Sequence, residues 1–442
     1  MNLLIVLIWF VIFIFLLWKL PFFSKFNLKP RTLVLLYLMH VIAGVALSLI
    51  YTFYYPQRNL ADTFKYYDDA KPLYNIIGTQ PLDFIRIIIG YNSDNIHLKP
   101  IFDQMNNWYV INNKYLYNDN RTLIKLNALI MLFSFGHYYV HILFFAMISL
   151  IGKLFIYKAY EKLFEHKKSL FFLAVFFVPS VIFWSSGILK EGPLFFIIGL
   201  LCFSFEKWSD NLKSLKYGTL VLLCFFALFF VKFYVAVTLF PGLISLFWLK
   251  RKEYRKPLLK TAIVHLCFVI AALAFHFITP FHSFIHGLKW QKSNFYGLAK
   301  TMNSGSVIQT QTLENDLWSF LCNIPEGLFN AIFRPFLWDG FIPSFSPVVL
   351  ASALENVILI VIFILCFKWF SKPTSKMLSY AFFCFSFTLL LFTLSGVVTP
   401  IIGTLVRYKI PAISFLLMGC FLLIDAQKIG EIKLLKRIEN WL

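Results

Sequence analysis

Charged residues are scarce in this chain, and cysteines are few. Asp, Glu, Lys and Arg make up 14% of the 442 residues, whereas hydrophobic residues make up 59% and aromatic residues 19%. This composition, with a mean hydropathy of +0.73, excludes an ordinary soluble domain. We predict an all-α, polytopic membrane protein that forms a single integral membrane domain over residues 1–442.

Several motifs are also missing. The seven cysteines show neither a disulfide framework nor a metal-binding spacing, since only Cys322 lies outside the hydrophobic runs and their ends. No Walker motif, GxGxxG or GxSxG is found, so nucleotide hydrolysis and serine-hydrolase chemistry have no support. The first hydrophobic run lacks a basic leader and a small-residue cleavage site, which favours a retained helix over a signal peptide.

About eleven hydrophobic runs approach the 20 or so apolar residues that a bilayer-spanning helix needs. They cover approximately residues 2–18, 32–52, 126–152, 169–186, 191–206, 217–233, 235–249, 258–279, 347–367, 377–398 and 408–425. The run at 126–152 has a second interpretation, a short interfacial helix followed by a span.

Basic residues indicate the orientation. Alternate connections hold 25 of the 41 Lys and Arg residues, and the positive-inside rule assigns these connections to the cytoplasm. The N-terminus is then outside and the C-terminus inside. Because the basic residues form short clusters between apolar runs, the net charge of +20 does not indicate a nucleic-acid partner.

Two long loops, at about 53–125 and 280–346, face outward and are nearly neutral. In the first, residues 60–77 are expected to form a helix that places Asp62, Tyr66 and Asp69 on one face. Residues 81–90 follow as an amphipathic run, which predicts a helix at the membrane interface.

Besides the basic residues in the cytoplasmic connections and in the two outward loops, four more lie where apolar runs meet the outer side. They are Lys190, Lys232, Arg407 and Lys409. Cations at membrane depth usually pair or carry a function. Arg407 and Lys409 either hold a lipid phosphate or extend to the headgroup layer. Glu355, inside a predicted span, is expected to pair with one of these cations.

Other charged residues also have two interpretations. Lys190 and Glu191 form either a structural ion pair in a tight hairpin or a phosphate ligand with a supporting carboxylate. Arg334 and Asp339, among aromatic residues, indicate a re-entrant or interfacial element. Asp62 is either catalytic or a solubilising residue at a helix start. His282 and His286 have a metal-like spacing but no third ligand, which favours interfacial histidines.

Short motifs resemble those of a known enzyme class. Ala61-Asp62 with Tyr66-Tyr67-Asp68-Asp69-Ala70 resembles the acidic first outward loop of GT-C type glycosyltransferases, which use polyprenyl-phosphate-linked sugars. Arg407-Tyr408-x-x-Pro411 is similar to an element that begins a late helix in these enzymes and in bacterial O-antigen-like polysaccharide polymerases. The segments 183–191 and 333–338 resemble parts of membrane proteins from bacterial polysaccharide gene clusters. A large soluble outer domain, present in some relatives, is missing.

The resemblance implies a glycosyltransferase or polysaccharide polymerase at the outer face of the bacterial cytoplasmic membrane. Its partners would be membrane lipids and a sugar on a polyprenyl phosphate or diphosphate, and its substrate an acceptor hydroxyl. Fixed cations stabilise the negative charge on the leaving phosphate. Arg407 is the first candidate, with Lys190, Arg334 or Lys409 assisting. The scheme requires no cofactor and leaves room for a divalent cation, for which no metal ligands are assigned.

A carboxylate must also accept the proton of the acceptor hydroxyl. Asp62 is the first candidate, and Asp69 and Glu191 are the alternatives. Aromatic side chains would line the sugar or prenyl groove: Tyr66, Tyr67, Trp184 and Trp338. The scheme expects Asp62 and Arg407 to share one outward cavity.

Two other functions fit the same residues. A transporter or flippase of lipid-linked sugars would use the cations to attract a diphosphate, although the sequence shows no paired broken helices in matching halves. A structural or assembly protein without chemistry would expose its charged helix ends to headgroups and tolerate their neutralisation.

Overall fold

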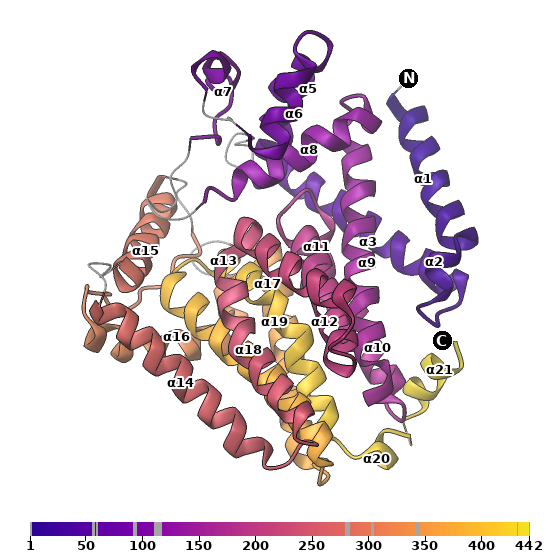
Figure 1. Ribbon diagram of the computed structural model, residues 1–442, viewed down its shortest axis with the longest axis vertical. Coiled ribbons are helices and arrows are strands. Elements are labelled where there is room, and N and C mark those ends of the chain that lie inside the picture. The colour runs from indigo at the N-terminus through magenta and orange to yellow at the C-terminus, as the bar shows by residue number, and fades with distance from the viewer. Residues whose placement is uncertain are drawn as a thin grey trace. The chain divides into compact units, whose positions relative to one another are not determined.

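The computed structural model describes residues 2–54, 58, 61–91, 95–109, 117–278, 283–301, 305–341, 345–430 and 432–441. Within this part of the chain the regular elements are helices (Figure 1), and extended pairing is limited to isolated bridges from Val307 to Ile401 and from Phe370 to Ile424. The all-α prediction is therefore confirmed.

Seven helices of the described chain are long and apolar enough to cross a membrane. They are α3 (Pro30–Phe53), α9 (Tyr138–Tyr160, extended by a 3-10 turn to Phe164), α12 (Glu191–Asp210), α13 (Leu215–Arg251), α17 (Pro347–Lys368), α18 (Ser375–Val398) and α19 (Ile402–Leu423). An eighth candidate is a bent pair, α10 (Lys168–Phe176) with α11 (Pro179–Ser186), whose axes differ by 42°. These helices support a membrane protein.

The helices differ from the eleven expected runs at several positions. The run at 126–152 divides into α8 (Asn120–Ser134) and α9, because Phe135 and Gly136 adopt left-handed backbone angles that end a helix. The runs at 217–233 and 235–249 form the single element α13, interrupted by non-helical angles at Lys232 (φ −156°, ψ 90°). The first and eighth runs form α1 (Asn2–Lys19) and α14 (Pro257–Ile278), whose apolar stretches are shorter than those of the seven spans.

The chain divides into two compact units. Unit 1 contains residues 1–159 and 182–233. Besides α1, α3, α8, α9, α12 and parts of α11 and α13, it contains α2 (Pro21–Ser24), α4 (Asp62–Asp68), α5 (Ala70–Asn75), η2 (Ile76–Gly78), α6 (Pro81–Ile89), η3 (Ile96–Leu98) and α7 (Lys99–Phe102).

The described residues of the first long loop pack as part of unit 1. Its helices bury an apolar cluster against α8 and α9 that includes Leu73, Ile87 and Trp108, and the Trp108 ring stacks on Phe102 at 4.4 Å. The expected helix over residues 60–77 is interrupted at Asp69, between α4 and α5. Helix α6 lies where the amphipathic run predicts a helix. It ends at Ile89, and the next residue, Gly90, has left-handed backbone angles (φ 80°). Figure 1 shows α5, α6 and α8 near one end of α9.

Close backbone approach joins two long helices of unit 1. A Cβ atom added at Gly199 of α12 would lie 2.0 Å from the carbonyl oxygen of Gly152 in α9. Only glycine fits this crossing, which is typical of small-residue helix contacts in membranes. The crossing fixes α12, and with it the position of Glu191 at the start of that helix.

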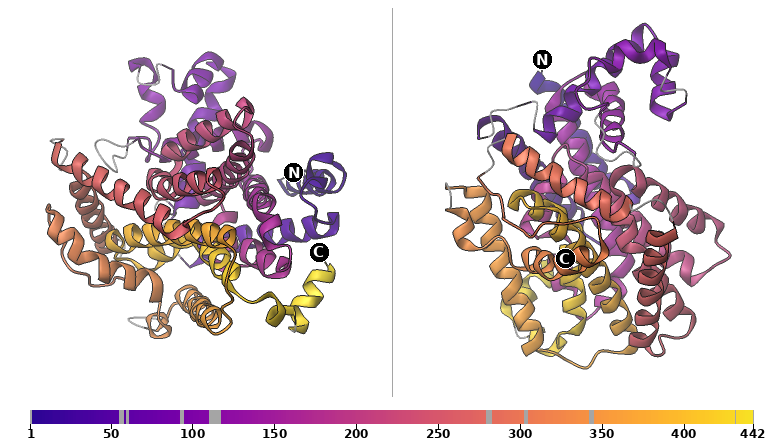
Figure 2. Two further views of the ribbon diagram at one scale, coloured as in Figure 1. Left: turned by 60° about the horizontal axis from the view of Figure 1, so that its bottom comes forward. Right: turned by 90° about the vertical axis from the view of Figure 1, so that its left-hand side faces the viewer.

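Unit 2 contains residues 160–181 and 234–441. It holds α10, α14, α17, α18, α19 and parts of α11 and α13, together with η4 (Glu161–Phe164), α15 (Ser283–Thr301), α16 (Leu317–Phe333), η5 (Leu337–Gly340), α20 (Ala426–Gly430) and α21 (Lys433–Trp441). Helix α18 packs on both α16 and α19, and these three lie side by side in Figures 1 and 2. Gly327 and Gly396 meet at the crossing of α16 and α18.

Candidate functional site

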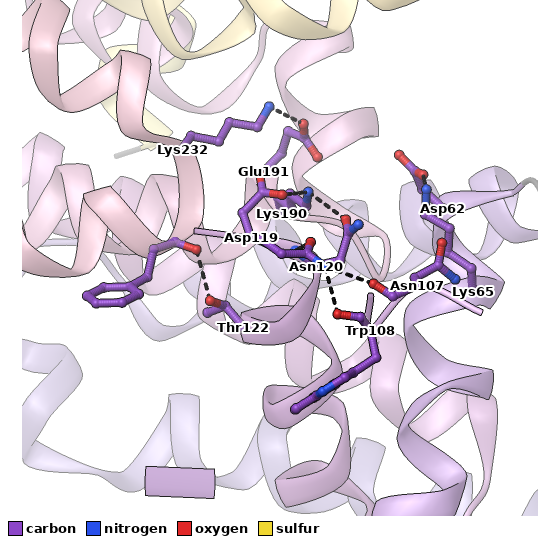
Figure 3. A network of polar contacts seen from close by, with 12 residues as sticks. Asp62, Lys65, Asn107, Trp108, Asp119, Asn120, Thr122, Lys190, Glu191 and Lys232 are labelled. Carbon is purple, nitrogen blue, oxygen red and sulfur yellow. Dashed lines mark hydrogen bonds and ion pairs between the residues drawn. The ribbon is translucent and has the colours of Figure 1, made fainter. Parts of the chain in front are cut away.

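Carboxylates stand at the starts of three helices in unit 1. Asp62 lies in the first turn of α4, Asp119 immediately precedes α8, and Glu191 is the first residue of α12. The partial positive charge of a helix N-terminus favours a carboxylate there. Each of the three also pairs with a lysine, so the folding of local helices assembles a polar network (Figure 3).

Lys190 is central to this network. It lies in the short turn between α11 and α12, and its Nζ donates to Asp119 Oδ1 at 2.6 Å and to Asn120 Oδ1 at 2.9 Å. The side chain is buried. Burial lowers the pKa of Lys190, while Asp119 opposes the shift. The ammonium is thus held in place by a carboxylate in a weakly hydrated environment.

Asp62 and Lys65 lie beside this lysine. They form an ion pair along α4, and both side chains retain about a fifth of their accessible surface, 22% and 21%. The ring of Tyr66 has Lys65 Nζ at 5.3 Å and Lys190 Nζ at 5.4 Å from its centroid. The structure therefore brings together Asp62, Tyr66 and Lys190, three residues that the sequence singles out.

The third ion pair is fully enclosed. Lys232 Nζ donates to Glu191 Oε1 at 2.7 Å, and the two side chains are 4% and 0% exposed. Lys232 is the residue at which α13 loses helical geometry. The interruption leaves nearby carbonyls without their usual helical donors, and Thr122 Oγ1 donates to one of them, Phe230 O, at 2.8 Å.

The structure does not pair Lys190 with Glu191, which was one of the two interpretations that the sequence left open. Although adjacent in sequence, the two side chains pair with Asp119 and Lys232 respectively. The reason is geometric, because consecutive residues at a helix start point in different directions. The break in α13 falls at Lys232, at the boundary between the runs 217–233 and 235–249.

Asp69, one of the two alternative bases, holds a loop. Its buried carboxylate accepts hydrogen bonds from the backbone N–H groups of Asn106 and Asn107 and from the Asn107 side chain, at 2.8–3.1 Å. Three bonds to a buried carboxylate favour a structural role. Glu191, the other alternative, is enclosed with Lys232, which also favours a structural role. Asp62 is then the accessible candidate base in unit 1.

The aromatic candidates differ in accessibility. Tyr67 is buried and donates its hydroxyl to Gly136 O, and burial raises the pKa of this phenol. Trp184 is buried with its ring edge against Phe183. Trp338 of unit 2 is 59% exposed and stacks on Phe336. Of these three, Trp338 is the most available to a ligand.

The cations of unit 2 occupy several environments. Lys409 is buried and donates to Ala331 O and Arg334 O at 3.1 and 2.8 Å, which satisfies carbonyls at the end of α16. Arg334 Nη1 donates to both carboxylate oxygens of Asp339, at 3.0 and 3.2 Å. Arg407 is half-buried on α19. Arg407 and Lys409 lie within α19, which begins at Ile402 rather than near residue 408.

Glu355 lies in α17, and its carboxylate accepts hydrogen bonds from Ser180 N at 2.6 Å and Ser180 Oγ at 2.5 Å. Lys409 is close enough to interact with it electrostatically. His286 is exposed on α15, whereas His282 lies outside the described residues. Among the described residues, no three His, Cys, Asp or Glu side chains are grouped as metal ligands.

Sequence reasoning missed a second polar cluster in unit 1. Lys153 Nζ lies 2.9 Å from both His40 Nε2 and Ser185 Oγ, and all three side chains are fully buried. Lys153 belongs to α9, although it directly follows the predicted run at 126–152 and was therefore counted in a cytoplasmic connection. His40 inside a hydrophobic run was the available signal, since a buried histidine needs a polar partner.

Comparison with known proteins gives no relative from which to transfer a function. The chain matches no known protein family, no curated protein and no solved structure. The side chains themselves are therefore the basis for the chemistry. In unit 1 these supply an accessible carboxylate beside two ammonium groups and an aromatic ring.

Proposed function

We propose that the chain is a membrane glycosyltransferase or polysaccharide polymerase that transfers sugar from a polyprenyl phosphate or diphosphate to an acceptor hydroxyl. The arrangement of Asp62 beside Lys65 and Lys190 is the main support. Asp62 would accept the proton of the attacking hydroxyl. The lysines would stabilise the negative charge that develops on the leaving phosphate, since preorganised cations in a dry site need little rearrangement.

The proposed topology contains eleven crossings. The seven long helices and the bent pair supply eight, and counting the two halves of α13 separately, with α1 and α14, adds three. The positive-inside distribution of Lys and Arg then places the N-terminus outside the bacterial cytoplasmic membrane and the C-terminus in the cytoplasm. The Asp62 site would face outward.

Transport of the same lipid-linked sugar is the second candidate. Two candidate spans are interrupted, one between α10 and α11 and one at Lys232 in α13. Paired broken helices in matching halves were not predicted from the sequence. Interrupted spans often form substrate sites in transporters because they place polar backbone groups within the membrane. The buried pair of Lys232 and Glu191 at one break fits this function as well.

One experiment separates these functions. The purified full-length protein in detergent is mixed with a polyprenyl-diphosphate-linked oligosaccharide, and products are examined by mass spectrometry for a new glycosidic bond. Bond formation supports the transferase. Movement of the lipid-linked sugar across the membrane of proteoliposomes without a new bond supports the transporter. If a panel of such donors gives neither bond formation nor movement, both functions are rejected.

A further inference from the structure

We propose that the C-terminal helix α21 is an interfacial helix that binds anionic phospholipid headgroups. This inference goes beyond the proposed function and does not depend on it. It rests on the polarity of α21, on its attachment to unit 2 and on the position of α21 beyond the end of a candidate span. The C-terminal segment is shown in Figures 1 and 2.

The sequence of α21 separates basic and apolar residues onto two faces. With 100° between successive residues of a helix, Lys433, Lys436 and Arg437 share one face, and Leu435 and Ile438 lie on another. The three basic side chains are exposed, whereas Leu435 is buried at 7% exposure. A short helix of this pattern suits the boundary between headgroups and acyl chains.

Contacts within unit 2 place α21 near the ends of other helices. The helix packs against α10. At the start of α10, Lys167 Nζ donates to Phe421 O and Leu422 O at the end of α19, at 3.0 and 3.1 Å. Helix α19 is a candidate span that ends at Leu423, ten residues before α21 begins. Covalent connection therefore keeps α21 close to a membrane boundary.

The end of α17 meets this same end of α19. Ser371 N donates to Leu423 O, and Asp425 N donates to Trp369 O, both at 2.9 Å. Exposed lysines lie at the start of α10, at the end of α17, between α17 and α18, at the start of α18 and in α20. They are Lys168, Lys368, Lys372, Lys376 and Lys428. Together with the three basic residues of α21, these five lysines give the ends of α10, α17 and α18 and the C-terminal segment an excess of positive charge, which would complement an anionic leaflet.

The proposal is tested by amide hydrogen exchange of the full-length protein in lipid nanodiscs. One sample contains phosphatidylcholine alone, and the other an equimolar mixture with phosphatidylglycerol. Each basic residue near an anionic surface contributes roughly a fivefold effect. We expect exchange within α21 to be at least about tenfold slower in the anionic nanodiscs, and the difference to disappear near 1 M salt, where charges are screened.

Variants identify the residues responsible. Lys433→Gln/Lys436→Gln/Arg437→Gln should remove the lipid dependence, whereas Lys433→Arg/Lys436→Arg/Arg437→Lys should retain it. The matched control is Lys252→Gln/Arg255→Gln/Lys256→Gln, which neutralises three exposed charges outside α21 and should leave the response intact. Equal exchange in both lipids, or an equal loss in this control, would overturn the proposal.

Discussion

Lys232 and Glu191 form a buried ion pair, with 2.7 Å between Nζ and Oε1, at the point where α13 is interrupted and α12 begins. A pair so enclosed links the two helix ends, because either charge left alone would lack both water and a counter-ion.

The pair should therefore show strong energetic coupling. We expect Glu191→Gln and Lys232→Met each to lower the free energy of unfolding by about 3–5 kcal/mol, measured in detergent by denaturant titration. The double variant should lose much less than the sum of the two, since no unpaired charge remains. Strict additivity would contradict a direct interaction.

Replacement of the candidate base should affect chemistry and not folding. Asp62→Asn should insert and purify as the wild type does but form product about 10²–10⁴ times more slowly, the usual contribution of a general base. Asp68→Asn is the matched control, because Asp68 lies on the same helix and pairs with Arg58 and Lys71 at the surface. Similar rates for Asp62→Asn and the wild type would remove Asp62 from the mechanism.

Lys190 should make donor binding sensitive to alkaline pH. Burial lowers its pKa below 10.5, so affinity for a polyprenyl diphosphate should fall as pH rises through this lowered value. Lys190→Arg should keep binding at that pH, since guanidinium stays charged. Binding that changes identically with pH in both proteins would contradict the role.

Stability should respond to Lys190 in the opposite direction. Between its lowered folded pKa and the ordinary unfolded value, the unfolded chain binds more protons than the folded protein. The Lys190 contribution therefore makes unfolding less favourable as pH rises through that window. A comparison of denaturant titrations of the wild type and Lys190→Arg across alkaline pH isolates this contribution.

Arg407 provides a separate test of phosphate recognition in unit 2. We expect Arg407→Ala to lose donor affinity and Arg407→Lys to recover only part of it, because lysine keeps the charge but cannot make bidentate contacts. Equilibrium binding of a polyprenyl diphosphate gives the measurement. Full affinity in Arg407→Ala would show that the residue extends to headgroups instead.

The glycine crossing in unit 1 should tolerate no side chain. Gly199→Ala would place its Cβ 2.0 Å from Gly152 O. We expect this overpacking to lower the free energy of unfolding by about 1–3 kcal/mol. Gly297→Ala is the control, because its Cβ would have no neighbour within 4 Å. Because Gly297 is at an exposed helical position, Gly297→Ala should raise the free energy of unfolding by about 0.5–1 kcal/mol. Thermal unfolding in detergent compares the two.

The sequence alone determined the helical class and the membrane character. Long apolar runs must satisfy their backbone groups internally, and a helix does this without a partner. The sequence also identified Asp62, Tyr66 and Lys190 as candidate site residues, because polar residues between apolar runs need an explanation. The break at Lys232 was visible for the same reason.

Only the tertiary structure decided how these polar groups pair. Lys190 pairs with Asp119, 71 positions earlier, and Glu191 with Lys232, 41 positions later, because helix packing brings distant helix ends together. Lys153 and His40 are joined in the same way across α9 and α3. Pairing depends on the direction of each side chain in three dimensions, which hydrophobic periodicity along one segment does not specify.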